Sequence, residues 1–459
     1  MPKRRANKKK KLNILWGSEQ PIRPTGYGVV SRNLCKRLVA RGHTVNVMGW
    51  DYNGEPMKHE EGWSMVHAGM ANWGGETSGG PNTPTVLESH IMDLKPDVYF
   101  SLIDCWYVGH AVVSTNQMGV PYVGYFPMDG YPISYAWKDI LKMIHTPLWM
   151  AHFGKNIFTD FVKQYHSGGS ADKELRDPVL DRYLENTGEV LWHGVDSDVF
   201  APMGDLEKIE IKKRMGIGHF DFTFLHVGRN ANRKQIPRLL EAFKIFLDQI
   251  DDPDRVGLLI HCGDPHDTKG MGGWNLPLMV KQMGLHKNIK FTDRGSNPLY
   301  GLSREELAMV YGVSDVHVLS TSGEGFGVPS AEAMSCGLPI ILPDNSTGPE
   351  LTGAHPDQKQ EVEEKGLART ERGWIVRNLT TVTGPKWGVN MGLVDILALS
   401  RAMKDAYDNP DLVKDVGANA RVWAIENLDW DMLTDQLESI LYKAAETEHP
   451  LAGNSTMGV

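Results

Sequence analysis

A glycine-rich stretch with two glutamates, residues 320–332, holds the residues best suited to chemistry in this sequence. An apolar strand is expected to end near Ser320 and a helix to open at Pro329, because proline suits the first helical position. Loop glycines let backbone N–H groups approach a ligand closely, and the N-terminus of a helix favours an anion. Glu324 in the loop and Glu332 in the first helical turn have seven residues between them and can face one ligand. Either glutamate alone could be a capping acid, but together they suit binding of sugar hydroxyls. The loop glycines are Gly323, Gly325 and Gly327.

A basic segment, residues 226–234, is the second candidate, since it also follows an expected strand and precedes an expected helix. Arg229 and Lys234 would reach into the same cleft from its other side. Fixed cations there can stabilise the negative charge that grows on a leaving nucleoside diphosphate, without a metal ion. Arg233 is the rival of Lys234 for this role, and the simpler alternative is a solvated basic loop.

Apolar runs alternate with helical patterns along the chain, and the pattern starts again after about residue 200. Such alternation predicts parallel sheets covered by helices on both faces. We therefore expect an α/β fold with two Rossmann-like domains that face each other across a cleft. Ligands of such folds bind at the carboxyl ends of the strands, so the chemically active residues should directly follow strands. The expected strands are Leu12–Gly17, Thr44–Gly49, Val98–Leu102, Tyr122–Tyr125, Ile144–Met150, Phe222–Val227, Val256–His261, Ile289–Thr292, Val316–Leu319 and Pro339–Leu342.

The domain boundary is expected near Pro202 and Gly204, which break the regular pattern. It separates an N-terminal domain, 13–202, from a C-terminal domain, 203–420. A helical stretch at 421–446 is expected to cross back onto the first domain. Residues 1–12 are expected to form a basic, disordered tail. Two polar segments, 167–188 and 354–373, are expected to be surface excursions without structural elements of their own.

Composition favours an ordinary globular protein of the cytoplasm, with 41% hydrophobic and 23% charged residues. No apolar run is long enough to span a membrane, and no secretory signal follows the N-terminal charges. The four cysteines are scattered, which suits a reducing compartment. The net charge of −9 hides a basic N-terminus, whose interpretation stays open between a solvated tail and an arm that binds DNA or an anionic membrane surface. Its basic residues are Lys3, Arg4, Arg5, Lys8, Lys9, Lys10 and Lys11.

Several motifs together resemble the retaining glycosyltransferase family 4, of GT-B architecture, over about residues 13–441. The family's acidic pair is similar to Glu324 and Glu332, and its Gly-Arg…Lys element is similar to Gly228, Arg229 and Lys234. Three further stretches match it, namely the junction His193–Pro202, the first loop with Gly26-Tyr27-Gly28, and the helix Glu305–Asp315.

The resemblance implies that the N-terminal domain binds an acceptor and the C-terminal domain binds a nucleotide sugar, with the anomeric configuration retained. Glu332 would hold the ribose hydroxyls, and Glu324 would hold the donor sugar. Arg229 and Lys234 would neutralise the diphosphate. The remaining implied donor contacts are Gly28, Gly228, Gly325 and the backbone amides of Phe326, Gly327 and Val328. A UDP- or GDP-sugar would be the substrate, and neither a cofactor nor a metal ion is expected. The pair Asp196 and Asp198 belongs to the junction turn and is not expected to bind metal.

The sequence departs from the family in the first domain, where many members place a histidine near the reacting sugar. Asp129 stands at the equivalent stretch, and Asp104, after the strand Val98–Leu102, is the other candidate. A carboxylate there could hydrogen-bond the sugar or stabilise positive charge at its anomeric carbon. Trp106 could stack on an acceptor, as could Trp137 and Trp149, although core packing is the more common role of a tryptophan.

The acceptor stays open at this stage. A glycan or lipid-linked glycan at the cytoplasmic membrane face is one hypothesis, and a hydroxymethylated DNA base, flipped out of its duplex, is another. Other function classes are a GT-B-fold nucleotide-sugar epimerase or hydrolase, and a non-catalytic sugar-nucleotide binder.

Overall fold

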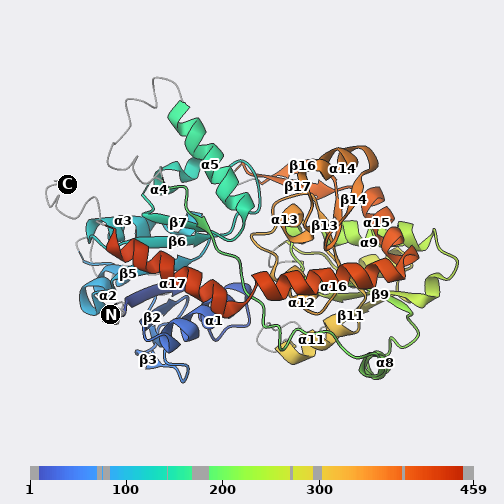
Figure 1. The fold of residues 1–459 in the computed structure, drawn as a ribbon, viewed down its shortest axis with the longest axis horizontal. Helices are drawn as coiled ribbons and strands as arrows, with labels where there is room; N and C mark the ends of the chain where they lie inside the picture. The colour runs from blue at the N-terminus through green and yellow to red at the C-terminus, as the bar shows by residue number, and fades with distance from the viewer. Residues whose placement is uncertain are drawn as a thin grey trace, which may run out of the picture.

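The computed structural model of the protein describes residues 10–69, 75, 83–141, 143–167, 186–268, 272–292, 302–384 and 388–447. Most of the predicted basic arm and most of the segment 167–188 lie outside these residues. The described chain forms two α/β halves side by side, each built around one sheet (Figure 1). The predicted fold class is therefore confirmed.

The N-terminal half is built on an eight-stranded sheet with the order β3-β4-β2-β1-β5-β6-β7-β8. All neighbouring strands are parallel except β3 and β4. The central strands are buried along nearly their whole length, as expected when helices cover both faces. The strands are β1 (Asn13–Ser18), β2 (Thr44–Gly49), β3 (Met57–Lys58), β4 (Ser64–Val66), β5 (Val98–Leu102), β6 (Tyr122–Phe126), β7 (Thr146–Trp149) and β8 (Glu189–Val190), and the helices are α1 (Gly26–Ala40), α2 (Val86–Leu94), α3 (Gly109–Gln117), α4 (Lys138–Leu141) and α5 (His152–Ser167).

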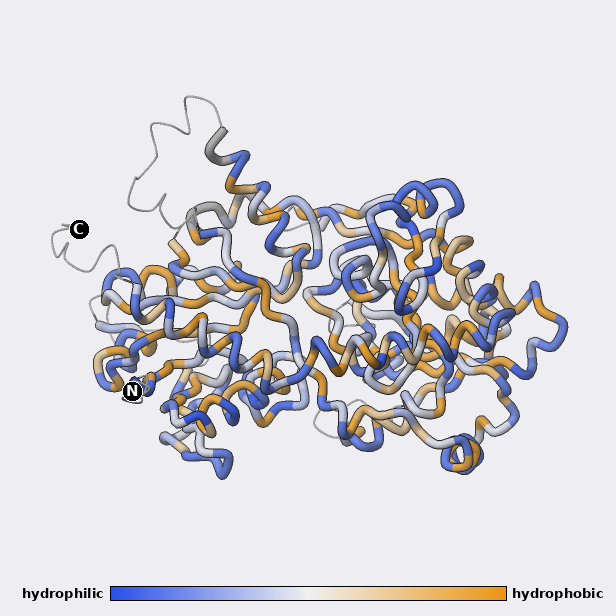
Figure 2. The backbone as a smooth tube through the Cα atoms, in the orientation of Figure 1, coloured by the Kyte–Doolittle hydropathy of each residue, from blue (hydrophilic) through white to orange (hydrophobic). Residues whose placement is uncertain are grey.

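The C-terminal half is built on a seven-stranded sheet with the order β11-β10-β9-β12-β13-β15-β14, parallel except for β14. Its strands are β9 (Phe222–Val227), β10 (Val256–His261), β11 (Ile289–Phe291), β12 (Val316–Val318), β13 (Ile340–Pro343), β14 (Leu367–Thr370) and β15 (Gly373–Val376). Its helices are α8 (Asp205–Arg214), α9 (Ile236–Leu247), α10 (Leu276–Gln282), α11 (Arg304–Gly312), α12 (Val328–Ser335), α13 (Gly348–Thr352), α14 (Lys359–Lys365) and α15 (Ile396–Asp408). In Figure 2, apolar segments run through both halves, in keeping with two cores.

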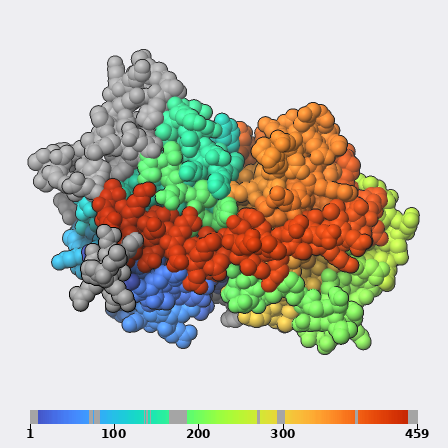
Figure 3. Space-filling model, viewed as in Figure 1, coloured from blue at the N-terminus to red at the C-terminus, as the bar shows by residue number. Residues whose placement is uncertain are grey.

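The last two helices run along one face of the molecule and join the halves (Figure 3). Helix α16 (Pro410–Asn427) packs on α12 and α15 of the C-terminal half. Helix α17 (Trp430–Glu446) packs on α1, β5 and β6 of the N-terminal half. The chain meets the first half already within α16, where the ring of Trp423 lies 5.3 Å from that of Trp192, and α17 then continues along that half. No described helix combines the length and the apolar character needed to cross a membrane.

Two elements differ from the sequence prediction. The segment 354–373 is not an unstructured excursion, because it contains α14 and β14, and β14 pairs antiparallel with β15 at the sheet edge. The prediction was wrong because the charged residues of the segment lie on the exposed side of a short helix, whose one buried residue is Val362. A separate hairpin, β16 (Asn378–Thr383) with β17 (Asn390–Val394), was not predicted at all.

Candidate active site

The strand orders place the predicted motifs at the two crevices where ligands bind in doubly wound sheets. The order in which successive strands are added to the sheet reverses between β1 and β5 in the first half, and between β9 and β12 in the second. The two strands of each pair remain parallel. At such switch points the loops that follow the two strands diverge and leave a crevice. The loops after β9 and β12 hold the basic segment and the glutamate loop. The loops after β1 and β5 hold the glycine-containing first loop and Asp104.

Lys234, Glu324 and Arg233 form a compact charged cluster between the loops after β9 and β12. Lys234 Nζ donates to Glu324 Oε1 at 2.6 Å, and Arg233 Nη1 lies 3.2 Å from Glu324 Oε2. The side chains of Lys234 and Glu324 are only 9% and 11% exposed. Arg233 also donates to the carbonyl of Gly323, so the glutamate loop is held by side chain and backbone alike.

The charge states of this cluster follow from its burial and its pairs. Burial alone would raise the pKa of Glu324, but the neighbouring Lys234 ammonium and Arg233 guanidinium outweigh it and lower the pKa to about 2. Burial lowers the pKa of Lys234 below its usual value, and Glu324 opposes that shift. Glu324 is therefore an anion, a hydrogen-bond acceptor, throughout the physiological range. Glu324 and Asp129 offset the charges of Lys234 and Arg233, and Arg229, whose charge also acts on Lys234, adds a third cation that suits an anionic ligand.

The opposite wall of the cleft is the loop after β6, with Asp129. Its carboxylate lies 3.3 Å from Arg233 Nε, which joins the two halves of the molecule. The backbone approach is equally close, because a Cβ atom built on Gly323 would lie 1.8 Å from the Asp129 carbonyl oxygen. A Cβ on Gly325 would lie 2.4 Å from Cβ of Pro127. In this structure the loop glycines thus make room for the N-terminal half.

Asp104 lies beside this wall and is paired with Tyr27 from α1. The Tyr27 hydroxyl donates to Asp104 Oδ1 at 3.4 Å. Burial raises the pKa of Asp104 to about 7, and the charge of Asp129 adds to the shift. Asp104 can therefore carry a proton near neutral pH. Perturbed carboxyl groups of this kind gather at functional sites.

Glu332 occupies the first turns of α12 and accepts a hydrogen bond at 2.9 Å from the Tyr311 hydroxyl of α11. Burial raises the pKa of Glu332 to about 7. Glu332 stands on the helix that directly follows the glutamate loop. Pro329 occupies one of the first two helical positions, and Gly327 before the helix has a φ of 101°, which favours glycine.

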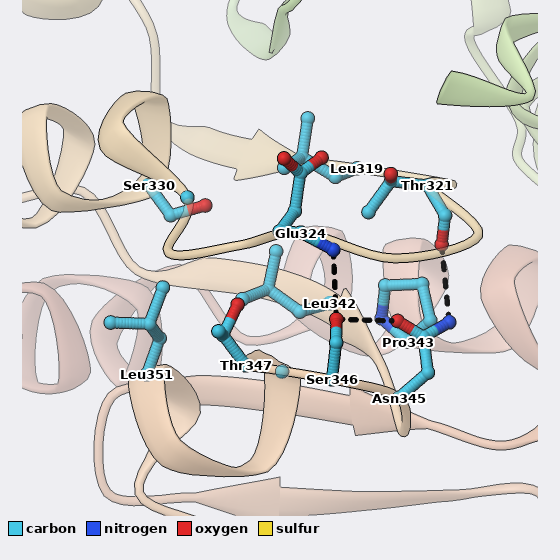
Figure 4. Close-up of a pocket in the computed structure, with 12 residues that line it drawn as sticks. Leu319, Thr321, Glu324, Ser330, Leu342, Pro343, Asn345, Ser346, Thr347 and Leu351 are labelled. Carbon is cyan, nitrogen blue, oxygen red and sulfur yellow. Dashed lines mark hydrogen bonds between the residues drawn. The ribbon is translucent and has the colours of Figure 1, made fainter. Parts of the chain in front are cut away.

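A small pocket of about 10 Å³, enough for about one water molecule, lies behind the glutamate loop. Figure 4 shows how this loop is tied to the loop after β13. Ser346 Oγ accepts from the Glu324 N–H at 2.8 Å and donates to Asn345 Oδ1 at 3.2 Å. Asn345 Nδ2 in turn donates to the Thr321 carbonyl at 3.2 Å. The network fixes the backbone on which Glu324 stands.

The other predicted residues lie in or near these loops. Arg229 is exposed, and its charge contributes to the lowered pKa of Lys234. Gly228 leaves space for Lys234, whose Cε atom would lie 3.4 Å from an added Cβ. Phe326 is buried, with its ring 5.0 Å from that of His193, and Val328 begins α12. Gly28 lies inside α1, where an added Cβ would meet the carbonyl of Arg23 at 2.3 Å, so the nearest neighbour of Gly28 is the chain's own first loop.

Of the tryptophans considered for the acceptor, two belong to the core. Trp149 and Trp137 are 0% and 4% exposed. Trp106 is half-buried, two residues after Asp104, and its ring lies 5.1 Å from that of Trp137. Of the three, Trp106 alone keeps a partly open ring near the site.

Sequence reasoning missed three features of the site. Tyr27 was noted only as part of a glycine motif, although it partners Asp104. Ser346 has a φ of 41°, and nothing in its residue type signals that position. The hairpin β16–β17 borders the cleft at Tyr131, and its alternating Thr-Val-Thr pattern before a Gly-Pro turn was the signal that could have found it.

No group of three or more His, Cys, Asp or Glu side chains within the described residues is arranged to hold a metal ion. Asp196 of the junction turn instead forms an ion pair with Arg304 at 3.1 Å.

Comparison with known proteins agrees with this geometry. Residues 207–358, which include the charged cluster and both glutamates, match the family described as glycosyl transferases group 1. The C-terminal half contains a glycosyl transferases group 1 domain. A D-inositol 3-phosphate glycosyltransferase of Geodermatophilus obscurus is 33% identical over 150 residues, 32% of this chain and 31% of that protein. A GDP-mannose-dependent phosphatidylinositol monomannoside mannosyltransferase of Mycolicibacterium smegmatis is 24% identical over 255 residues, 54% of each chain. The chain thus spans from about a third to about a half of these curated relatives.

Solved structures match almost the whole chain. Sucrose-phosphate synthase from Thermosynechococcus elongatus matches with a TM-score of 0.64 and 16% identity over 95% of this chain and 99% of its own. Anabaena HepE, solved with UDP and glucose, matches with a TM-score of 0.62 and 15% identity over 94% of this chain and 100% of its own. The glycosyl transferases group 1 domain is therefore one half of a GT-B fold.

Proposed function

We propose that this protein is a retaining glycosyltransferase that moves a sugar from a nucleotide-diphosphate sugar to an acceptor hydroxyl. The observation that carries the proposal is the cluster of Lys234, Arg233 and Glu324 at the switch point of the C-terminal sheet, in which Lys234 and Glu324 are buried. It combines cations for a diphosphate with an ionised carboxylate for sugar hydroxyls.

Each charged residue has a role in the proposed reaction. The bond between the anomeric carbon and the diphosphate oxygen breaks, and Lys234 with Arg229 stabilises the negative charge on the leaving group. Glu324 accepts hydrogen bonds from the donor sugar, and Glu332 accepts them from the ribose. The acceptor oxygen bonds to the anomeric carbon on the same face, and its proton passes to the leaving phosphate. No metal ion is required, since fixed cations neutralise the diphosphate.

The names of similar proteins support a nucleotide sugar as the donor. The Mycolicibacterium mannosyltransferase is described as GDP-mannose-dependent, and Anabaena HepE was solved with UDP-glucose as well as with UDP. We therefore expect a UDP- or GDP-sugar donor for this chain.

On the acceptor side, Asp104, Asp129 and Tyr27 face the donor loop with oxygen atoms that can bind hydroxyl groups. These residues suit a sugar or another polyhydroxyl acceptor. We therefore favour a glycan or a lipid-linked glycan.

A hydroxymethylated DNA base is the weaker acceptor candidate because of where the basic arm leaves the domain. Lys10 pairs with Asp97 at 2.6 Å, and the Asn13 N–H donates to Asp97 at 2.8 Å. Asp97 precedes β5, so the described start of the arm lies at the amino ends of the strands, opposite the cleft. The described start of the arm therefore does not line the site.

The test is a screen of the full chain against UDP- and GDP-sugars, with release of UDP or GDP as the readout. We expect release of UDP or GDP from at least one donor, and faster release when a polyhydroxyl acceptor is present. Proton NMR of the product should show that an α-linked donor gives an α-linked product. An epimerase would return an altered sugar still joined to its nucleotide, and a binder would retain the nucleotide without turnover. Either result, or the absence of both binding and release, would refute the proposal.

A further inference from the structure

The hairpin β16–β17 touches both walls of the cleft, although it belongs to neither main sheet. Its base is held by Asn378, which donates to the Asp344 carbonyl at 2.7 Å and accepts from Asn345 Nδ2 at 3.1 Å. Asn345 is the residue that also holds the glutamate loop through the Thr321 carbonyl. One end of the hairpin is therefore fixed to the backbone that frames Glu324.

Strand β17 is bonded directly to the glutamate loop and to the loop that carries Asp129. The Gly392 N–H donates to the Ser322 carbonyl at 3.0 Å. Two residues earlier in the same strand, Asn390 and Tyr131 exchange both backbone hydrogen bonds, at 2.8 and 3.0 Å. The same edge of one short strand thus holds position 322 and position 131.

The contact with the N-terminal half is close as well as hydrogen-bonded. A Cβ atom on Gly130 would lie 2.5 Å from Val389 Cγ1 and 2.7 Å from the Asn390 carbonyl oxygen. Val389 packs against the buried cluster of the N-terminal half. Residues 130 and 131 are thus held against β17 by packing and by hydrogen bonds, and Asp129 directly precedes them.

We propose that β17 positions Asp129 for the transfer reaction, with Asn390 as the positioning residue, by holding the loop 129–131 in register with the glutamate loop. This inference rests on the proposed function. Without the two Asn390 bonds, the Asp129 carboxylate would still contact Arg233 at 3.3 Å, but the backbone of its loop would lose both hydrogen bonds to β17. A displacement of about 1 Å at a reacting group can cost about a hundredfold in rate.

The variant Asn390→Pro tests the proposal because it removes one N–H that points at Tyr131. Asn390 faces Thr383 across the hairpin in a pair whose backbone groups are not bonded to each other, so the proline leaves the backbone ladder intact. It also removes the bond at 2.6 Å that Thr383 Oγ1 donates to Asn390 Oδ1. The matched control is Thr381→Pro, opposite Gly392, where the N–H by the same alternation points away from β17. Gly130→Ala disturbs the same contact from the other half, should the proline variant fail to fold.

The measurement is a double-mutant cycle with Asp129→Asn, scored as kcat and donor KM. We expect Asn390→Pro and Gly130→Ala to lower kcat by about tenfold or more, with donor KM and UDP affinity within about twofold of the wild-type values. In the Asp129→Asn background the same changes should have no further effect, and Thr381→Pro should have none in either background. Equal losses in both backgrounds, or an unchanged kcat, would overturn the proposal.

A second readout needs no substrate. Tyr131 and Asn390 exchange both hydrogen bonds, a pairing in which the Cα atoms lie about 5.5 Å apart, within reach of a disulfide. The double variant Tyr131→Cys with Asn390→Cys should cross-link on oxidation, and failure of the folded protein to do so would overturn the contact and the proposal. A wild-type chain that turns over no nucleotide sugar would overturn the proposed function together with this role. Additive losses in an active enzyme would overturn this role alone.

Discussion

Glu324 shows why the charged cluster is a functional feature rather than a stabilising one. Removing the charges of Lys234 and Glu324 from water costs several kcal/mol per ion, and their mutual attraction often only offsets that cost. A buried cluster of this kind contributes little net stability compared with apolar side chains of the same volume. Glu324 keeps its charge here because Lys234 and Arg233 lie within 3.2 Å. A site that must meet an anionic donor has use for such preorganised charges.

At this scale we expect Lys234→Met and Glu324→Gln each to lower turnover by about a hundredfold or more, since preorganised charges at a transition state contribute that much. The assay is release of UDP or GDP from the accepted donor, with circular dichroism to show an intact fold. Lys208→Met is the matched control, because Lys208 forms a similar pair with Asp315 at 2.7 Å. Asp315 directly precedes β12, so this pair lies at the amino ends of the strands, opposite the site. Equal activity of the site and control variants would contradict the assignment.

Glu332 leads to a pH prediction. Its pKa of about 7 means that the carboxylate is largely protonated at pH 6 and largely ionised at pH 8. Binding of two ribose hydroxyls favours the ionised form, so UDP affinity should fall as the pH drops through 7, by about tenfold between pH 8 and pH 6. Calorimetric titration of wild type and Glu332→Gln at both pH values measures this. The variant should lack the part of the pH dependence that Glu332 causes, and identical pH profiles would refute the role.

The residue types and spacing predicted that Glu324 and Lys234 follow strands at one switch point, and the structure brings these two side chains together. Residue types and spacing did not identify which cation forms an ion pair with which carboxylate. Arg233 stood only as the rival of Lys234, yet it contacts Glu324, Gly323 and Asp129 at once. That arrangement depends on how closely the two halves approach, and no local pattern in the sequence encodes an interdomain distance.

At the scale of elements, long buried strands were predicted to within two residues because their apolar runs are continuous. The strand β1 is Asn13–Ser18 where Leu12–Gly17 was expected. Short elements on the rim were not predicted, since their burial pattern is set by neighbours distant in the sequence. Most of β16, for instance, is exposed. The position of the hairpin is set by the bonds of Asn378 to Asp344 and Asn345 and by those of Asn390 to Tyr131 rather than by an apolar face.

Helix α17 gives a prediction about an element. Its apolar face packs on the N-terminal half, and Leu437 is fully buried in that contact. Leu437→Ala should therefore destabilise the protein by about 2–5 kcal/mol through lost burial and a new cavity. Met432→Ala, in the same helix but 43% exposed, should change stability by less than about 0.5 kcal/mol. Urea unfolding followed by tryptophan fluorescence compares the two, and similar midpoints would show that α17 does not anchor the first half.

For the whole molecule, the halves are joined by contacts at both ends of the cleft. One end holds the Asp129–Arg233 pair and the Tyr131–Asn390 bridge. At the other, Glu350 of α13 accepts hydrogen bonds from the first half, namely from the His152 backbone N–H at 2.9 Å, from His152 Nδ1 at 2.7 Å and from Trp192 Nε1 at 2.6 Å. Glu350 thus caps the first turn of α5 from the other half of the molecule, where a negative charge is favourable.

Glu350→Ala should loosen the closed arrangement of the halves, because it removes every one of those three bonds and leaves the Trp192 indole without its acceptor. The overall dimensions of the protein should then increase, and small-angle X-ray scattering should report a larger radius of gyration than for the wild type. Glu371→Ala is the control, since Glu371 is 76% exposed and pairs only with Arg372 of its own half among the ion pairs described. Glu350→Ala should bind UDP with an affinity close to that of the wild type, because Glu350 lies outside the cluster of Lys234 and Glu324. An unchanged radius of gyration in Glu350→Ala would mean that the other contacts, those at Asp129, Tyr131 and the helices α16 and α17, hold the halves together without Glu350.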